Sequence, residues 1–225
     1  MTHILDRPAW SALNTRHADL AEGGRLARRY PPSIVPFAAT AEDDEESLSA
    51  LAALATPGLP MVFLQRPPVA LPPGLAVAFS ADAVQMIADQ AHGRIADERI
   101  EQLGEADAEE MLTLATLTKP GPFTLRAQAL GRFWGIRQEG RLVAMGGVRM
   151  SQTGFTELSG LCTHPDVRGR GFGRLLLAFV AGEIAARGDT AYLHAFASNT
   201  SAIALYESAG FRLRAPFHAV AAQKA

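Results

Sequence analysis

A turn rich in arginine and glycine constrains this chain more than any other stretch, because it joins two segments of different periodicity. An apolar, strand-like run covers residues 155–162, and a helical pattern begins near residue 171. Glycine allows the backbone to approach a ligand closely and to adopt positive φ. The first amides of a helix lack partners within it and lie at the positive end of its dipole. We therefore expect a phosphate or diphosphate to bind here. The residues expected to hold it are Arg168, Gly169, Arg170, Gly171, Phe172, Gly173 and Arg174.

The spacing of the glycines separates three kinds of phosphate-binding turn. A nucleotide triphosphate loop requires Gly-Lys followed by Ser or Thr, whereas Arg174 and Leu175 follow the glycines here. The dinucleotide fingerprint is G-x-G-x-x-G, whereas this chain has glycines at 169, 171 and 173. The stretch does match Arg/Gln-x-x-Gly-x-Gly/Ala, which resembles the acyl-CoA-binding motif of the GCN5-related N-acetyltransferases, the GNAT superfamily. The alternative is a glycine-rich surface turn that carries basic side chains.

The composition is that of a globular protein. The chain has 225 residues, of which 48% are hydrophobic and 20% charged, so it can bury a sizeable core. A net charge of −2 gives no indication of a nucleic-acid partner. No apolar run approaches the ~20 residues of a membrane span, and no secretory signal is evident. The single cysteine, Cys162, excludes an internal disulfide and disfavours a cysteine-based zinc site. We expect a cytoplasmic protein without a membrane partner or a bound metal.

Hydrophobic periodicity from residue 95 onward predicts the order β-α-β-β-β-α-β-α-β-β. A helix joins the strand at 155–163 to the strand at 191–196, so these two strands should be parallel. The other neighbouring strands should be antiparallel. The predicted fold class is therefore α/β (α+β), a mixed, mostly antiparallel twisted sheet with a parallel central pair and flanking helices.

A second motif lies downstream of the turn and strengthens the resemblance. Asn199, Ala202, Leu205, Tyr206-Glu207 and Gly210-Phe211 are similar to the second GNAT motif, N-x-x-A-x-x-L-Y-E-x-x-G-F. The loop at 118–123 resembles that of the FR47-like subgroup. The resemblance covers residues 95–225, the expected GNAT domain. Residues 1–94 are expected to form a small N-terminal α/β subdomain, either a degenerate copy of the same fold or a family-specific extension.

The resemblance implies a cofactor, acetyl-CoA or another acyl-CoA. In the family the pantetheine arm lies beside the strand that precedes the glycine turn, and the matching positions here are Leu161, Cys162 and Thr163. By the same match the Leu161 amide would face the thioester oxygen as an oxyanion hole. Asn199 should hydrogen-bond the pantetheine arm and cap the helix that follows it.

The resemblance also implies two catalytic residues. Glu157, near the start of the central strand, is the expected general base, while His194, water or a backbone carbonyl are alternatives. Tyr206 is expected to protonate the leaving thiolate, since its pKa is about 10. Cys162 is expected to be a buried small residue rather than a nucleophile, because no base or helix N-terminus is evidently paired with it.

Two functions follow from these residues. The first is an acyl-CoA-dependent N-acyltransferase that transfers acetyl to a primary amine of a small molecule or peptide by direct attack in a ternary complex. The second is a non-catalytic acyl-CoA-binding regulatory module, for which neither Glu157 nor Tyr206 would be needed. The sequence leaves open the acceptor amine, the length of the acyl chain, and whether the protein is a monomer or a homodimer.

Overall fold

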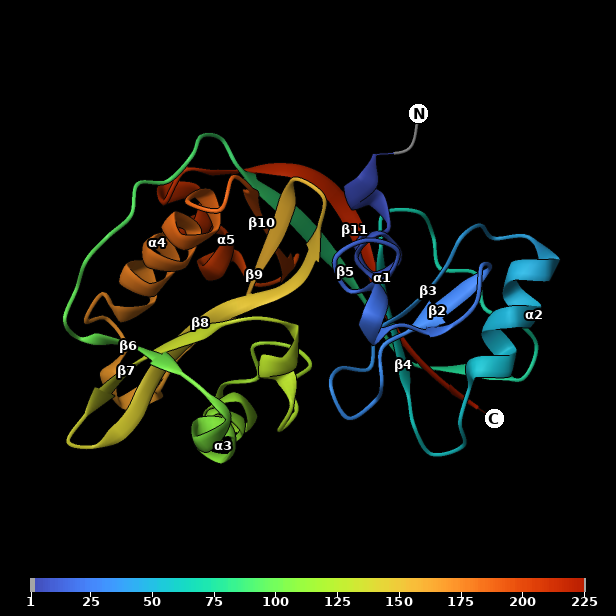
Figure 1. The fold of residues 1–225 in the computed structure, drawn as a ribbon, viewed down its shortest axis with the longest axis horizontal. Coiled ribbons are helices and arrows are strands. Elements are labelled where there is room, and N and C mark those ends of the chain that lie inside the picture. The colour runs from blue at the N-terminus through green and yellow to red at the C-terminus, as the bar shows by residue number, and fades with distance from the viewer. Residues whose placement is uncertain (1–2, 225) are drawn as a thin grey trace.

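The computed structural model describes residues 3–224. The part of the chain after residue 95 forms most of a large sheet and three helices (Figure 1). These elements are β6 Ile100–Leu103, α3 Ala108–Thr118, β7 Phe133–Gln138, β8 Arg141–Gln152, β9 Phe155–Thr163, α4 Phe172–Ala185, β10 Thr190–Phe196, α5 Thr200–Ser208 and β11 Phe211–Lys224. Short 3₁₀ turns lie at Ile4–Asp6, Ala18–Leu20, Glu105–Asp107, Ala127–Leu130 and Pro165–Val167.

The N-terminal part has its own small sheet and two helices. Its elements are α1 Pro8–Leu13, β1 Glu22–Gly23, β2 Ala27–Arg29, β3 Ala38–Thr40, α2 Glu45–Leu54, β4 Met61–Gln65 and β5 Leu75–Ala88. Asp44 caps α2 through a hydrogen bond from the Ser47 amide, 2.7 Å long, as an acidic N-cap should. Strands β1, β2 and β3 form a three-stranded antiparallel sheet.

The eight-stranded sheet has the order β4-β11-β5-β10-β9-β8-β7-β6. Within it, among the described residues, only β9 and β10 pair in parallel, which confirms the predicted central pair and the mixed, mostly antiparallel sheet. The hairpin between β7 and β8 turns at Glu139 and Gly140, with φ of 50° and 79°. Such positive values suit the tight turn of a two-residue hairpin.

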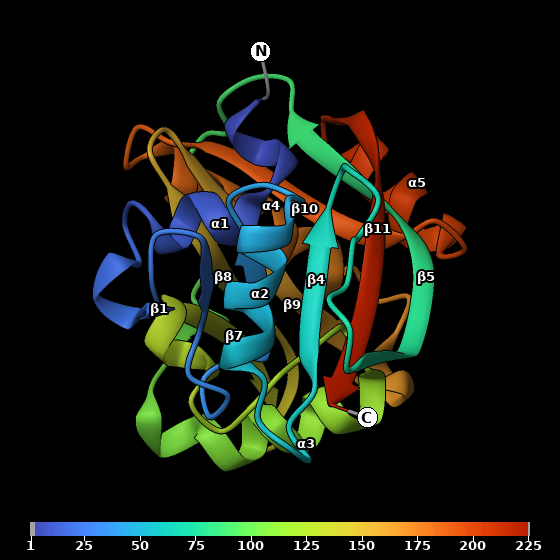
Figure 2. The same cartoon turned by 90° about the vertical axis from the view of Figure 1, so that its right-hand side faces the viewer.

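The two parts of the chain exchange strands in this sheet. Strand β5 comes from the N-terminal part but pairs with both β10 and β11. Strand β11 comes from the C-terminal part but pairs with both β4 and β5. Figure 2 shows β4, β11 and β5 side by side. The sheet therefore continues across the boundary predicted between residues 94 and 95, and the independence of the segment 1–94 stays a prediction.

From α1 to β5 the described N-terminal part follows the order of α3 to β11, except that no helix corresponds to α5. Helix α2 joins β3 to β4, and Phe37 bridges Val62 in parallel, just as α4 joins the parallel strands β9 and β10. In each part the second of these strands has an antiparallel neighbour donated by the other part. The chain before α2 is acidic, whereas the chain before α4 is basic, and the origin of the N-terminal part as a degenerate copy or a family-specific extension stays a prediction.

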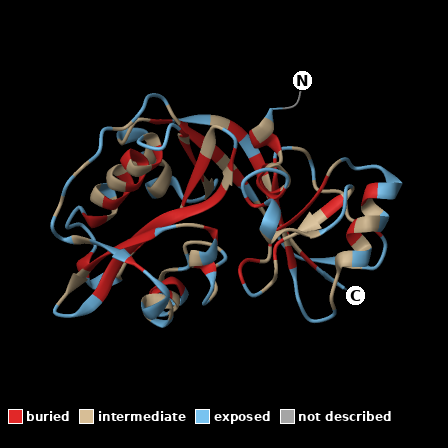
Figure 3. Ribbon diagram, in the orientation of Figure 1, coloured by how far each residue is buried: buried red, intermediate tan, exposed pale blue. Residues whose placement is uncertain are grey.

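Helices cover both faces of the sheet. Helix α4 buries Leu176, Leu177 and Val180 against one face, and α3 buries Met111 and Leu114 against the other. Figure 3 shows the resulting buried band along β8 and β9. Helix α1 packs on β8 and β3 and so lies between the two parts.

Two local predictions were wrong. The local pattern predicts a strand at 75–79 and a short helix at 82–89, but the two segments form one strand, β5, because pairing with β10 and β11 on its two sides outweighs local propensity. The two strands expected at 211–213 and 217–222 are likewise one strand, β11. A register shift lies between Leu213 and Ala215, directly before Pro216. Proline is tolerated in a strand at such a bulge, so the strand continues.

Candidate functional site

A cavity of about 700 Å³ opens between the two parts of the chain. We call the side lined by β9, β10, the start of α4 and α5 the first arm, and the side lined by β4, β5 and β11 the second arm. Of the residues predicted for the site, the cavity is lined by Leu161, Cys162, Thr163, Arg168, Gly173, Asn199 and Tyr206. The fold thus brings residues from four separate elements to one place.

The first arm begins where two parallel strands separate. β9 and β10 are in register only from Phe155 opposite Thr190 to Glu157 opposite Tyr192. Beyond that point β10 pairs with β5 and β9 pairs with β8, so the side of β9 that faces β10 has no strand partner. Gly160, with φ of 65°, adds a local irregularity just before Leu161. The two strands therefore separate beyond this short register, which leaves room for an extended ligand arm.

The arginine- and glycine-rich turn lies at the end of this opening. Gly169 and Gly171 have φ of 78° and 82°, and nothing lies within 4 Å of the place where a Cβ would be. The first hydrogen bond of α4 runs from the Leu175 amide to the Gly171 carbonyl, 3.0 Å. Within residues 3–224, the backbone amides of 169–174 donate to no protein acceptor. Six free amides at the start of a 14-residue helix fit a diphosphate.

The side chains of the turn lie in different surroundings. Arg168 lines the cavity, whereas Arg170 lies near Gln138 with its Nη1 3.4 Å from Oε1. Arg174 turns away and donates from Nη2 to the Ser208 hydroxyl at 2.8 Å. Phe172 is buried in the core beneath α4, so only its backbone is available to a ligand.

Helix α5 contributes Asn199 and Tyr206. The Asn199 carboxamide oxygen accepts from the Ala202 amide at 3.2 Å, which confirms the predicted cap. Tyr206 lines the cavity about two turns further on. Burial raises the pKa of Tyr206 above its usual value of 10.0, so its hydroxyl keeps its proton at neutral pH.

Cys162 is a small buried residue, as expected. It is 8% exposed, and burial raises the pKa of its thiol to about 11. Because the thiolate is the nucleophile, this cysteine is poorly suited to carry an acyl group at neutral pH.

Glu157 lies in a buried ion pair rather than at the cavity wall. Its two carboxylate oxygens accept from Nε and Nη2 of Arg149, at 2.8 and 2.7 Å. Its side chain is 0% exposed, and Oε1 also lies 2.7 Å from Nδ1 of His194. Burial by itself would raise the pKa of Glu157, but the charge and hydrogen bonds of Arg149 and His194 lower it to about 2. This surrounding does not favour the predicted role of Glu157 as the direct base.

His194 is the member of this group that lines the cavity. Its Nδ1 faces Glu157, and its Nε2 lies 3.0 Å from the amide nitrogen of Gln85. Because the Gln85 amide donates and the carboxylate accepts, the ring is neutral with its proton on Nδ1. Burial lowers the pKa of His194 below its usual 6.5, against the opposing effect of Glu157.

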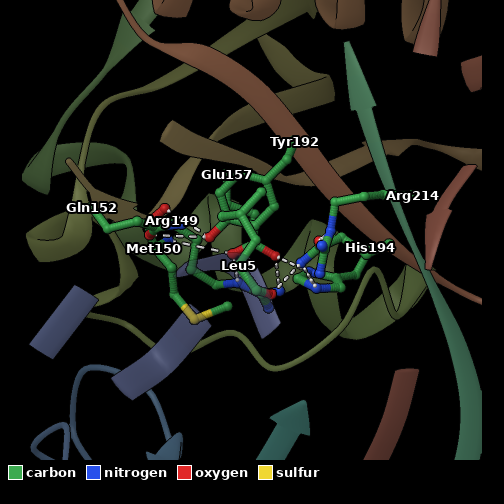
Figure 4. A network of polar contacts seen from close by, with 9 residues as sticks. Leu5, Arg149, Met150, Gln152, Glu157, Tyr192, His194 and Arg214 are labelled. Carbon is green, nitrogen blue, oxygen red and sulfur yellow. Dashed lines mark hydrogen bonds and ion pairs between the residues drawn. The ribbon is translucent and has the colours of Figure 1, made fainter. Parts of the chain in front are cut away.

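The network continues into the N-terminal part (Figure 4). The Gln85 oxygen accepts from Arg214, and Arg214 Nη2 pairs with Asp6 at 2.6 Å. Sequence reasoning missed Gln85, Arg149 and Arg214, because each is a polar side chain within a strand and belongs to no local motif. The one available signal was Arg149 at an otherwise apolar stretch of β8, since buried charges are usually paired.

The fold and the cavity together define an acyltransferase of the GNAT type. An acetyltransferase assigned to the GNAT family, from Novosphingobium aromaticivorans DSM 12444, has a crystal structure that matches this one with a TM-score of 0.93. The two sequences are 41% identical, and the match covers 100% of both chains. The chain belongs to the GNAT family.

Other relatives match the fold or part of the sequence. A family model described as FR47-like protein matches residues 133–220. A GCN5-related N-acetyltransferase from Kribbella flavida shares the fold over 98% of this chain and 96% of its own, with a TM-score of 0.64 and 15% identity. The [ribosomal protein bS18]-alanine N-acetyltransferase of Salmonella typhimurium (strain LT2) is 47% identical over 55 residues, which are 24% of this chain and 37% of that protein. The chain thus covers little more than a third of this curated relative.

In the part of the chain that the structure describes, no helix is both long and apolar enough to cross a membrane.

Proposed function

We propose that this protein is an acyl-CoA-dependent N-acyltransferase that transfers acetyl from acetyl-CoA to a primary amine by direct attack in a ternary complex. The observation that carries the proposal is the opening between β9 and β10, which leads to the six free amides of residues 169–174. The diphosphate would lie on these amides and near Arg168. The pantetheine arm would lie along Leu161, Cys162 and Thr163, with Asn199 beside it.

Acetyl-CoA, when bound, supplies an activated thioester carbonyl. The amine nitrogen forms the new C–N bond while the C–S bond breaks and its electron pair goes to sulfur. The Leu161 amide is the proposed donor to the carbonyl oxygen, as an oxyanion hole. The Tyr206 hydroxyl is the proposed donor to the departing thiolate, since the rise of its pKa by burial keeps it protonated. The nitrogen is positively charged after the attack and loses its second proton to solvent as the amide forms. Tyrosinate regains its proton from solvent when the products leave.

The proton of the acceptor ammonium also needs a destination. We propose that His194 accepts it at Nε2, in place of the Gln85 donor, because His194 lines the cavity and Glu157 does not. Glu157 then acts as a positioning residue that holds Nδ1 and stabilises the imidazolium. A general base typically contributes 10²- to 10⁴-fold to the rate.

Release of coenzyme A from acetyl-CoA in the presence of a panel of primary amines tests the proposal. Amine-dependent thiol release with saturation kinetics is the expected result. Binding of acetyl-CoA without turnover on any amine would favour the alternative, a regulatory module that binds acyl-CoA. Absence of acetyl-CoA binding in calorimetry would contradict both. A cytoplasmic location is part of the same proposal, because acetyl-CoA is supplied there.

A further inference from the structure

The second arm of the cavity is built by the exchanged strands and includes none of the residues proposed to hold the cofactor. Its walls come from the N-terminal part through Phe37, Val62, Leu64, Phe79 and Ala83, and from β11 through Ala219–Ala221. Small alanines on β5 and β11 leave the space open, while the larger side chains enclose it. Because the thioester would lie between the two arms, this second arm is where the acceptor amine should enter.

The second arm is apolar up to its mouth. Phe79 and Phe196 lie edge to face with ring centroids 6.0 Å apart, and their exposed fractions are 51% and 42%. Aromatic side chains that remain half exposed beside a cavity offer surface for an apolar ligand group. An acceptor with an aliphatic or aromatic side chain would bury this surface.

The charges around the cavity have one sign. Its charged side chains are Lys119, Arg149 and Arg168, and among the described residues no acidic side chain lines it. A polyamine or a lysine-rich peptide would bring further positive charge without a counter-ion, which is costly in a buried site. An acceptor that carries a negative group would instead find a partner.

Arg149 offers the donor for such a group. Its Nε and Nη2 are bound to Glu157, and its guanidinium lies over the Phe37 ring at 4.7 Å. Nη1 has no hydrogen-bond acceptor among residues 3–224 and points toward the loop at Gly121, where an added Cβ would lie 3.8 Å away. The side chain is only 11% exposed, and both Arg149 and Gly121 line the cavity. Charge-assisted hydrogen bonds from arginine to carboxylate are among the strong ones in proteins.

We infer that the acceptor is an amine that carries both an apolar side chain and a carboxylate, as an apolar α-amino acid does. The apolar side chain occupies the arm between Phe37 and Phe79, and the carboxylate accepts from Nη1 of Arg149. The inference rests on the proposed function, because it concerns the acceptor of the same reaction.

Calorimetry on the full-length protein, alone and saturated with coenzyme A, tests this inference with matched probes. L-Leucine carries an apolar side chain and a carboxylate. L-Leucinamide has the same side chain with a neutral amide in place of the carboxylate, and putrescine is a dication. Leucine should bind at least tenfold more tightly than leucinamide, and putrescine should not bind. Equal affinity for leucine and leucinamide, tighter binding of putrescine, or no binding of leucine would overturn the inference.

A pair of variants tests the location of the apolar group. Ala221→Leu places a larger side chain in the second arm and should weaken leucine binding at least tenfold. Ala78→Leu is the matched control, because Ala78 is an exposed residue of β5 outside the cavity, and it should leave leucine binding unchanged. Equal effects of the two variants would overturn the assignment.

Acetyl-CoA binding is measured in parallel, so its absence would contradict the proposed function, whereas cofactor binding without preference for leucine contradicts only this inference.

Discussion

Nδ1 of His194 lies 2.7 Å from Oε1 of Glu157, and this contact decides which of the two residues can take up a proton near neutral pH. The carboxylate has a pKa lowered to about 2 and stays ionised throughout the usual pH range. The imidazole has a pKa below 6.5 and is neutral at pH 7. A base must be unprotonated to act, so the two residues predict different pH profiles.

We expect kcat/KM to rise with pH along a limb whose midpoint lies below 6.5, because burial lowers the pKa of His194. Protonation of His194 removes the base, so activity is lost as the pH falls through this pKa. His194→Gln should lower kcat by roughly 10²-fold and abolish the limb. A wild-type profile that stays flat down to pH 4 would instead favour Glu157 or water as the acceptor of the proton.

Glu157→Gln is expected to destabilise the fold more than it affects the cofactor. The change leaves the Arg149 guanidinium buried without its counter-ion, and breaking a buried pair from one side costs roughly 3–5 kcal/mol. Urea unfolding monitored by circular dichroism measures the loss. In the double variant Glu157→Gln with Arg149→Met the free energy of unfolding should partly recover, since no unpaired charge remains. A single variant as stable as the native protein would contradict this view of the pair.

Gly171→Ala should weaken acetyl-CoA binding about tenfold. Gly171 has φ of 82°, where an alanine costs roughly 1–2 kcal/mol, and relief of this strain would shift the amides that face the diphosphate. Gly154→Ala is a matched control, because Gly154 has φ of 78° in a hairpin that does not line the cavity. Both variants should lose similar stability, but only Gly171→Ala should change the dissociation constant measured by calorimetry.

Tyr206→Phe should lower kcat by roughly 10²-fold with little change in acetyl-CoA affinity. The variant keeps the ring and removes the hydroxyl that donates to the thiolate. Because the tyrosine must be protonated, the native pH profile should fall only above pH 10, and this descending limb should vanish in the variant. If native and variant proteins release thiol at the same rate, another group or water supplies the proton.

Expression of residues 95–225 alone should give a protein without cooperative unfolding. Strand β10 would lose its partner β5, and β11 would lose both β4 and β5. Unfolding by urea, followed by circular dichroism and by tryptophan fluorescence, measures the outcome, with the full chain as reference. A cooperative transition in the fragment would show instead that residues 95–225 form an independent domain.

Local signals predicted the parts of the site that depend on backbone conformation. The glycines at 169 and 171, the cap at Asn199 and the parallel pairing of β9 and β10 each have a cause within a short stretch of sequence. Their positions follow from positive φ, from side-chain capping and from the helical connection between two strands. Several members of the two family motifs therefore lie around one cavity.

Other features depend on contacts between distant segments and were beyond local reasoning. Gln85 and His194 are hydrogen-bonded although they lie 109 residues apart in the sequence, and no spacing rule connects them. The stretch around Ala83 looks helical by itself and becomes a strand only because β10 and β11 flank it. Likewise, Glu157 of β9 is buried in an ion pair with Arg149 of β8, and no local pattern predicts this pairing.

Because β5 and β11 are exchanged, the proposed binding of the cofactor and the proposed binding of the acceptor amine depend on different parts of the chain. The turn at 168–174 and the opening between β9 and β10 come wholly from the C-terminal part, whereas much of the proposed acceptor arm is lined by Phe37, Val62 and Phe79. We therefore expect mutations in the first 94 residues to change which amines bind without changing the turn at 168–174 that is proposed to hold the diphosphate. Diversification of substrate choice among descendants of this scaffold would then be concentrated ahead of residue 95.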